Sequence, residues 1–458
     1  MKTSGRNSSR RPKSTTASPN ATVALRAAWV LPIDGIPISN GVVTVHGGQI
    51  SAVTAVSQAG GHPLLDLGEA VLLPGLVDTH CHLEWSLMEG LIPKQSFARW
   101  LGAFLPIRDR MRPEDPLIAA RWAALQALTA GTTTLADSGP AGVGVRSLVE
   151  SGQRGIVHLE AFGNQRGDAA RANADQVAGR IDDLAARTNG RVHVGVSPHA
   201  PYSVGPEVWR ALLTHPELAK RRVATHLAES HAEFRAISAG QGALAALFRR
   251  MGWGDAARWD GEGGVVARVE ANAGLTGGMV AAHCVHVNQA DAERLAERRV
   301  SVAHCPTSNR QLHCGRAPVA VLRRAGVTVT LGTDSPASAG PYDLRAEART
   351  CRRVHASARE PLAAKTLVEM MTVDGASALG LADMVGVLRP GMRADIVAFS
   401  PGPEGWRSTD PYERVLDPGA RATLVMVDGN TLLDANGPVL VSTDHIRRAA
   451  REAAARLC

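Results

Sequence analysis

Short apolar runs rich in β-branched residues alternate along most of the chain with longer helix-like segments rich in Ala, Leu and Arg. Such short runs are typical of buried strands, because parallel strands covered on both faces are almost continuously apolar. The pattern predicts eight strands, at 75–80, 132–137, 155–161, 192–197, 222–226, 279–283, 300–304 and 327–332. Helices are predicted after most of them, for example at 141–151, 169–187, 207–213 and 290–298.

Eight strands alternating with helices favour an α/β fold, a parallel (β/α)8 TIM-type barrel over 74–385. An open doubly wound sheet is the alternative, but no G-x-G-x-x-G motif follows an early strand, so its dinucleotide-binding form lacks support. Aromatic residues make up only 4% of the chain, which suits helices packed closely on parallel strands. A length of 458 residues suits one large barrel with an accessory domain.

Short β-rich segments separated by tight turns flank the barrel region on both sides, at 23–73 and 386–440. Neither segment is long enough to be a stable domain alone. We therefore expect one small β-sandwich domain built from both chain ends, with a C-terminal helix over 441–458. The expected strands of the two segments lie at 23–30, 41–45, 50–56, 395–398 and 422–427.

The first 22 residues have almost no apolar side chains and carry much of the formal net charge of +7. Such a segment cannot offset its own ordering entropy, so we interpret 1–22 as a flexible basic tail. A nucleic-acid arm or a targeting peptide is the alternative, although the missing apolar region argues against a secretory signal. The basic residues of the tail are Lys2, Arg6, Arg10, Arg11 and Lys13.

Cysteine usage indicates the compartment. None of the six cysteines forms a C-x-x-C pair, and two lie beside candidate site histidines, where a disulfide would distort the site. Reduced thiols fit a cytoplasmic protein. No apolar run reaches the roughly 18 residues that span a bilayer.

We also expect a homodimer that acts on a small-molecule substrate, with neither membrane nor nucleic acid as a partner.

Polar side chains gather where the predicted strands end, and that end of a barrel carries the active site. His80 and His82 lie two apart on the first strand, so both can reach one ion. His226 ends the fifth strand, His283 the sixth, and Asp334 follows the eighth. An H-x-H pair alone is a moderate signal. Burying these five polar groups together at one end of the barrel without partners would cost free energy, and this favours a metal site.

We predict that His80, His82, His226 and Asp334 hold one divalent metal ion. Three imidazoles and one carboxylate suit Zn²⁺, and would accept Fe²⁺ or Mn²⁺. Two-metal hydrolases need a bridging ligand, often a modified lysine on a middle strand. The strand predicted at 192–197 contains no lysine, and neither do the other middle strands. This favours a single ion.

These motifs resemble the amidohydrolase superfamily, in its cytosine deaminase/chlorohydrolase branch. The resemblance runs in order through most of 24–430. It implies a metal-dependent hydrolase acting on non-peptide C–N bonds. The matching segments are Pro74-Gly75-Leu76-Val77-Asp78-Thr79-His80-Cys81-His82, Ala130-Gly131-Thr132-Thr133-Thr134, Ser197-Pro198-His199-Ala200-Pro201-Tyr202-Ser203, His226-Leu227-Ala228-Glu229, Ala282-His283-Cys284, Gly332-Thr333-Asp334-Ser335 and Leu388-Arg389-Pro390-Gly391-Met392-Arg393-Ala394-Asp395.

A narrower resemblance, carried for example by His82-Leu83-Glu84 and by 304–310, is to aminodeoxyfutalosine and adenosine-type deaminases. It implies an aminopurine nucleoside or related amino-heterocycle as substrate, with aminodeoxyfutalosine of menaquinone biosynthesis among the candidates. Glu84 and His199 are candidate substrate contacts.

One position departs from the related methylthioadenosine/S-adenosylhomocysteine deaminases. There a glutamate that holds the ribose follows the Leu-Pro-Ile segment, whereas here Arg108 follows it. A cation cannot accept hydrogen bonds from ribose hydroxyls. Arg108 is compatible with an acidic substrate, or with a side chain that simply faces solvent.

The residues also suggest separate catalytic roles. Asp334 is both ligand and candidate proton acceptor from water, and His283 would orient that water or polarise the attacked carbon's substituent. Glu229, three residues after His226, can turn into the cavity as a proton shuttle. A triazine-type chlorohydrolase and a guanine or pterin deaminase are alternatives on the same site. A non-catalytic barrel acting as an assembly partner is the alternative of another class.

Overall fold

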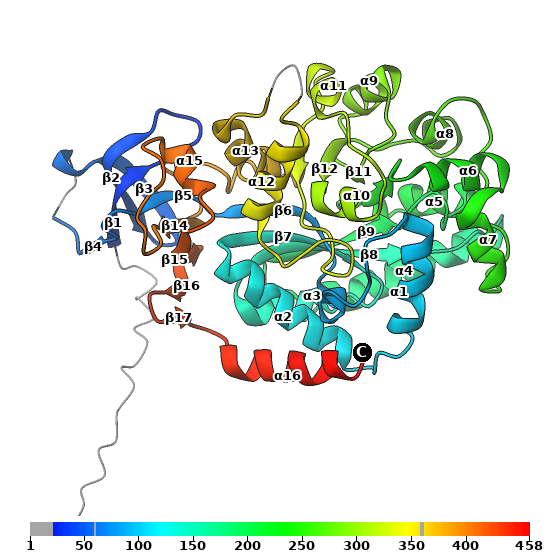
Figure 1. Cartoon of the computed structure of the whole chain (residues 1–458), viewed down its shortest axis with the longest axis horizontal. Helices are drawn as coiled ribbons and strands as arrows, with labels where there is room; N and C mark the ends of the chain where they lie inside the picture. Colours follow the sequence, from blue (N-terminus) through cyan, green and yellow to red (C-terminus); the bar gives the residue numbers. More distant parts are fainter. Residues whose placement is uncertain (1–21, 59–60, 358–360) are drawn as a thin grey trace, which may run out of the picture.

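The computed structural model describes residues 22–58, 61–357 and 361–458 (Figure 1). The expected basic tail, 1–22, lies outside these residues except for its last position. Each of the eight strands predicted in the middle of the chain is present, with bounds that shift by one or two residues. They are β6 (Leu76–Cys81), β7 (Thr132–Gly139), β8 (Arg154–Ala161), β9 (Val192–Pro198), β10 (Ala224–Leu227), β11 (Val280–His283), β12 (Ser301–His304) and β13 (Val329–Leu331).

These strands form two four-stranded parallel sheets, β6-β7-β8-β9 and β10-β11-β12-β13. Within each sheet the spatial order follows the chain order, unlike a doubly wound sheet, whose order reverses at a switch point. A parallel bridge joins Val196 to Val223 between the sheets, and another joins Cys81 to Asp334. Carboxyl ends of strands from both sheets therefore meet at the same edge.

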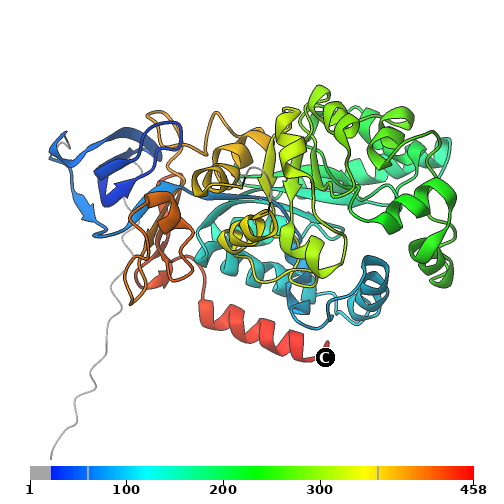
Figure 2. The same cartoon turned by 45° about the horizontal axis from the view of Figure 1, so that its top comes forward.

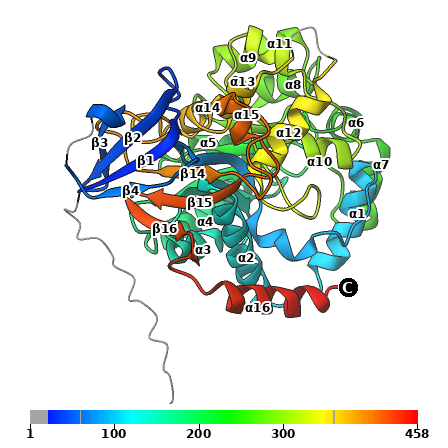
Figure 3. The same cartoon turned by 60° about the vertical axis from the view of Figure 1, so that its left-hand side comes forward.

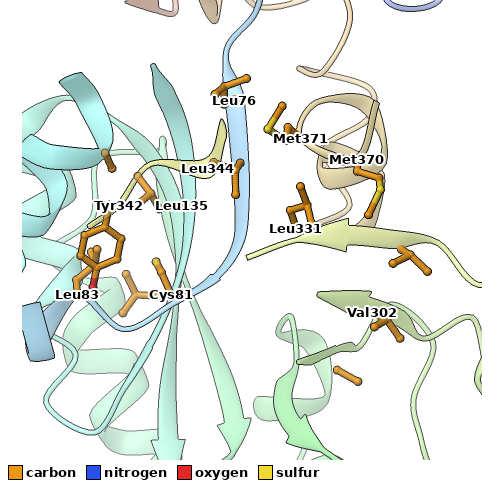
Figure 4. Packing of buried hydrophobic residues seen from close by; sticks show 14 of the residues in the cluster. Leu76, Cys81, Leu83, Leu135, Val302, Leu331, Tyr342, Leu344, Met370 and Met371 are labelled. Carbon is orange, nitrogen blue, oxygen red and sulfur yellow. The ribbon is translucent and has the colours of Figure 1, made fainter. Parts of the chain in front are cut away.

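Apolar side chains fill the seam where β6 approaches β13. Figure 4 shows Leu76 of β6 and Leu331 of β13 facing Met370 and Met371, and all four are fully buried. The backbone amide of Val77 donates to the carbonyl oxygen of Met371 at 2.8 Å, which fixes this contact. Burial of side chains of this size contributes about 1.5–3 kcal/mol each.

Helices follow most strands and cover the outer faces of the two sheets (Figures 1 and 2). Their apolar positions pack into the main core with the strands, as for Ala120, Ala124 and Leu128 of α2. The helices are α1 (Phe97–Arg108), α2 (Asp115–Thr129), α3 (Gly144–Ser151), α4 (Asp168–Ala185), α5 (Pro206–Thr214), α6 (His231–Ala239), α7 (Gly242–Arg250), α8 (Val265–Asn272), α9 (Gln289–Glu297), α10 (Pro306–Gln311), α11 (Val319–Arg324), α12 (Leu344–Val354), α13 (Ala364–Met370), α14 (Val373–Ala378), α15 (Pro411–Val415) and α16 (Thr443–Ala455), with 3-10 turns η1 (Val56–Gln58), η2 (Leu83–Met88) and η3 (Leu218–Lys220).

Strands from both chain ends share one nine-stranded sheet, in the order β17-β16-β15-β14-β5-β1-β2-β3 with β4 beside β1 (Figure 3). The join is the antiparallel pairing of β5 with β14, which matches Val71 to Phe399 and Pro74 to Ile396. The strands are β1 (Thr22–Val30), β2 (Ile38–His46), β3 (Gln49–Ala55), β4 (Leu64–Asp66), β5 (Val71–Pro74), β14 (Ile396–Ser400), β15 (Arg421–Val427), β16 (Asn430–Asp434) and β17 (Gly437–Pro438).

Helix α16 closes the chain by lying along α2 (Figure 1). It buries Ala450 and Ala453 in a small cluster with Ala119 of α2 and Leu87 of η2. Across the described residues, no helix combines the length and the apolarity that a membrane span requires.

A buried ion pair connects the end sheet to the parallel strands. Arg154, the first residue of β8, donates from Nε to Asp395 Oδ2 at 2.8 Å and from Nη2 to Asp428 Oδ1 at 2.7 Å. The Asp395 side chain is only 1% exposed and that of Arg154 only 4%. Removing one partner of such a pair leaves an uncompensated buried charge.

We expect Asp395→Ala to lower the free energy of unfolding by about 3 kcal/mol, because the Arg154 guanidinium would lose the fully buried one of its two counterions and keep only the partly exposed Asp428. Urea unfolding would measure the loss. The matched control is Asp66→Ala, since Asp66 pairs with Arg26 but its side chain is 59% exposed. Its loss should be much smaller, because an exposed ion pair is screened by water and salt. Equal losses in the two variants would contradict a special role for the buried pair.

Candidate metal centre

The histidines and the aspartate predicted as metal ligands come together. His80 lies near the end of β6, His82 directly after it, His226 near the end of β10 and Asp334 after β13. All four are buried. The ring of His80 lies 4.8 Å from the rings of both His82 and His226, centroid to centroid. His283, the last residue of β11, stacks on His226 at 5.6 Å.

Backbone strain is concentrated at this edge of the sheets. Ala228, His283, Cys284 and Asp334 have positive φ angles of 51°, 71°, 44° and 59°. A left-handed conformation costs a residue with a side chain about 1–3 kcal/mol and persists only where the surroundings enforce it. Here the strain turns the chain sharply after β10, β11 and β13. These turns aim side chains into the space between the strand ends.

Backbone carbonyl groups fix how two histidines present their nitrogens. His82 donates from Nδ1 to the Ser138 carbonyl oxygen at 2.7 Å, and His226 donates from Nδ1 to the His199 carbonyl oxygen at 2.8 Å. Each neutral ring therefore keeps a lone pair on Nε2. These two Nε2 atoms lie only 3.0 Å apart. Two lone pairs cannot hydrogen-bond to each other, so the arrangement calls for a cation between them.

Burial keeps these rings neutral. It lowers the pKa of His226 well below its ordinary value, reinforced by the neighbouring histidines, and it also lowers the pKa of His82. Neutral imidazole is the form that binds metals. Because both rings resist protonation, a proton cannot readily take the place of a metal cation between the two Nε2 atoms.

The remaining donors complete a set suited to a metal. Asp334 Oδ1 lies 3.5 Å from His82 Nε2 and 3.8 Å from His80 Nε2, while its Oδ2 accepts from Ser338 Oγ at 2.9 Å. His80 Nε2 is buried and has no hydrogen-bond partner among the described residues. Buried polar atoms are normally paired, so this nitrogen also points to an ion. Three imidazoles and one carboxylate fit Zn²⁺.

Glu229 lies on the same side as these donors. Its Oε1 is 3.8 Å from His283 Nε2, and both side chains are buried. Burial raises the pKa of Glu229 well above its ordinary value, and Asp334 and Glu233 add to the shift. His283 donates from Nδ1 to Asn309 Oδ1 at 2.9 Å, which leaves its Nε2 as an acceptor facing Glu229. Burial therefore favours the protonated form of the Glu229 carboxyl group and the neutral form of the His283 imidazole.

A cavity of about 580 Å³ opens above the metal donors. Glu229, His82, His226, His283 and Asp334 all line it. The chain has 6 Phe, 8 Trp and 3 Tyr, and eight of these seventeen residues line this one cavity. Nearly half of the few aromatic residues of this protein thus form the wall of one cavity, which suits flat or apolar parts of a ligand. They are Trp85, Phe97, Trp100, Phe104, Phe162, Tyr202, Phe248 and Trp253.

The three residues predicted to contact substrate are placed differently. His199 lines the cavity and its Nδ1 pairs with Ser203 Oγ at 2.6 Å. Arg108 also lines the cavity, and its half-exposed guanidinium donates to the carboxylate of Asp109. Glu84 lies beside the cavity rather than on its lining, with Oε2 accepting from the Ala141 amide at 3.2 Å.

Sequence reasoning missed Glu160. It lies near the end of β8, lines the cavity, and its buried Oε1 has no partner among the described residues. Burial raises its pKa to about 8, with Asp137 adding to the shift. The signal was available, since Glu160 is an acidic residue in the otherwise apolar end of a predicted strand. The aromatic wall gave no such signal, because its members are scattered over 85–253.

Comparisons with known proteins show the family of the chain. The model of the amidohydrolase family matches residues 71–432. A 5-methylthioadenosine/S-adenosylhomocysteine deaminase from Pelotomaculum thermopropionicum is 32% identical over 394 residues, which cover 82% of this chain and 84% of the relative. A 5'-deoxyadenosine deaminase from Methanosarcina acetivorans is 28% identical over 453 residues, covering 95% and 98%.

A solved structure extends the likeness to three dimensions. It is an adenosine deaminase from Xanthomonas campestris with bound zinc, with a TM-score of 0.80 and 25% identity, covering 95% of this chain and 98% of that one. The resemblance stated from the motifs is confirmed. The chain belongs to the amidohydrolase family.

Proposed function

We propose that this protein is a metal-dependent hydrolytic deaminase of aminopurine nucleosides or closely related amino-heterocycles. The observation that carries the proposal is the position of Glu229, a buried carboxyl group beside the metal donors at an aromatic cavity. A ring that needs a proton while water attacks it would find both the stacking surface and the proton donor there. The deaminases named among the relatives support this choice of substrate class.

The proposed architecture is a closed (β/α)8 barrel over 74–385, with 23–73 and 386–440 as one accessory β domain and 441–458 as a docked helix. Parallel bridges at both seams between the two sheets support closure. The pairing of β5 with β14 supports a single accessory unit. All six cysteines are free, five of them buried, which supports a reducing, cytoplasmic setting.

The proposed cofactor of the catalytic centre is one Zn²⁺ ion, held by His80, His82, His226 and Asp334. The facing lone pairs of His82 and His226 and the unpaired His80 Nε2 support this donor set. When bound, such an ion supplies Lewis acidity that activates water at neutral pH. Fe²⁺ and Mn²⁺ also accept these ligands.

The protein's own residues would manage the protons. Glu229, held protonated by burial, donates to the ring nitrogen next to the attacked carbon. Asp334 accepts a proton from the attacking water, and His283 orients that water through its free Nε2. Water adds across the ring C=N bond, with its hydroxyl on the carbon and the proton from Glu229 on the nitrogen. The proton taken up by Asp334 then passes to the amino group, the hydroxyl on the carbon returns a proton to Glu229, and the C–N bond to the amino group breaks. The products are an oxo-heterocycle and ammonia.

The cavity wall suggests how the rest of the substrate is held. Aromatic rings would stack on the heterocycle, and the unpaired Oε1 of Glu160 would accept a hydroxyl hydrogen bond. Arg108 stands where related deaminases place a ribose-binding glutamate. Its guanidinium would attract an anionic substituent at the cavity mouth.

Ammonia release tests the function itself. Purified protein should release ammonia from at least one of adenosine, methylthioadenosine, aminodeoxyfutalosine or an aminopterin, and should release no chloride from chlorotriazines. His80→Ala should lose one equivalent of metal and the activity together, because the donor set is broken. His193→Ala, a change at an exposed histidine of β9, is the control. Chloride release without ammonia release would overturn the deaminase proposal in favour of a chlorohydrolase.

Glu229→Gln should lower kcat about 10²–10⁴-fold while the metal content stays unchanged, because an amide of the same shape cannot transfer the proton. Steady-state kinetics and elemental analysis on the same preparation would measure both quantities. Near-normal turnover would remove Glu229 from the mechanism. A lower metal content would instead give it a role in holding the centre.

Arg108→Gln should lower kcat/KM about tenfold for nucleosides that carry a distal carboxylate, because a charge-assisted hydrogen bond is lost. Neutral nucleosides should be affected less than about twofold. The ratio of kcat/KM for the two substrate types is the measurement. An unchanged ratio would mean that Arg108 faces solvent and plays no part in selection.

A further inference from the structure

We propose that His304, Cys351 and His355 form a second metal site, which binds one Zn²⁺ ion and ties helix α12 to strand β12. One ligand atom from each of the three residues lies within 4.8 Å of the others, and all three residues are buried. None of them belongs to the donor set of the catalytic centre.

This cluster lies behind the strands rather than in the cavity. Ala303 packs with Val77, Ala136 and Ile156 on the inner face of the parallel strands. Successive side chains of a strand point to opposite faces, so His304 points outward, towards α12. Two other outward positions, Val302 and Leu331, appear in Figure 4 on their strands β12 and β13. A wall of backbone therefore separates the cluster from the catalytic centre.

The other two donors come from the end of α12 and its C-terminal cap. Cys351 lies in the last turn of the helix, and His355, four residues later, is the residue that caps it, so the two side chains lie near each other. Asp343 caps the start of this helix by accepting from the amides of Arg345 and Ala346, which fixes its rotation. Cys351 and His355 both face inward, with exposures of 0% and 6%.

The distance between the two imidazoles suits coordination better than hydrogen bonding. His304 Nε2 and His355 Nε2 are 3.4 Å apart. This is long for a hydrogen bond between nitrogens, whose usual length is about 2.9–3.0 Å. With Zn–N bonds of roughly 2.0–2.1 Å, the edge of a coordination tetrahedron is about 3.4 Å. The observed separation therefore matches two ligands of one tetrahedral ion.

Hydrogen bonding alone pairs the two imidazoles poorly. Their Nε2 atoms make only the long 3.4 Å contact with each other. A metal ion would use both Nε2 lone pairs together with the Cys351 thiolate, so coordination satisfies these atoms better than the contact alone.

The electrostatic surroundings also fit a thiolate-bound cation. Burial lowers the pKa of His304 to about 3 and that of His355 to about 4, so both rings are in the neutral, ligating form. Burial raises the pKa of Cys351 to about 12, and a bound metal would displace its proton. The buried carboxyl of Glu347, one turn before Cys351, lies on the same side. The Arg316 guanidinium lowers the pKa of His355 further, and the negative charge of a bound thiolate would offset the positive charge of Arg316.

Cobalt substitution can isolate this site, because sulfur is absent from the catalytic donor set. After metal removal and reloading with Co²⁺, we expect two equivalents per chain and a near-ultraviolet thiolate-to-cobalt charge-transfer band. Cys351→Ser should lose the band and one equivalent. His355→Gln should weaken or lose the same band. The exposed Cys458 provides the matched control, since Cys458→Ser should keep both equivalents and the band.

His80→Ala separates this proposal from the proposed function. It should lose the catalytic equivalent and ammonia release while keeping the thiolate band. A folded wild-type protein that binds one equivalent and shows no such band would overturn the second site, whatever its activity. So would a band that survives both Cys351→Ser and His355→Gln. The wild-type measurement decides even if a variant fails to fold.

Discussion

The candidate metal centre of this protein depends on one constraint, the repulsion between two nitrogen lone pairs. His82 and His226 each donate a hydrogen bond from Nδ1–H to a backbone carbonyl group. Their Nε2 atoms, which carry lone pairs, lie 3.0 Å apart. Only a cation makes that contact favourable. The carbonyl group of Ser138 belongs to β7, the strand beside β6, and that of His199 to the loop after β9, the strand bridged to the chain just before β10. The sheet itself therefore sets the ligand geometry.

The rest of the site follows from holding such a contact in place. Left-handed residues after β10, β11 and β13 turn the chain where side chains must converge. That strain is sustained by the buried seam beneath, where Asp78 accepts from the hydroxyl and the amide of Thr333, one residue before Asp334. The favourable packing of the apolar seam thus offsets the free-energy cost of the strained backbone and of the buried polar groups.

Sequence reasoning predicted the features that follow local rules. Strands and their ends were found because apolar runs stop where polar residues begin, and the proposed ligands lie at those ends. Residues that act through long-range geometry were not found. Trp253 and Trp100 are far apart in the chain, and β5 is a four-residue strand whose partner β14 lies more than 300 residues away. Glu160 is different, because an acidic residue at the end of a predicted strand could have been recognised. Whether Glu84 touches substrate depends on a side-chain direction that no spacing encodes.

That pairing of β5 with β14 also has a consequence for how the chain folds. Contacts so distant in sequence are slow to form, because a long loop must close before they contribute. During synthesis β5 leaves the ribosome early. Its edge that pairs with β14 stays unpaired until the last fifth of the chain has been made. An exposed strand edge is a template for association with other chains. The early strands of this protein are therefore the segment most in need of protection while the ribosome is still at work.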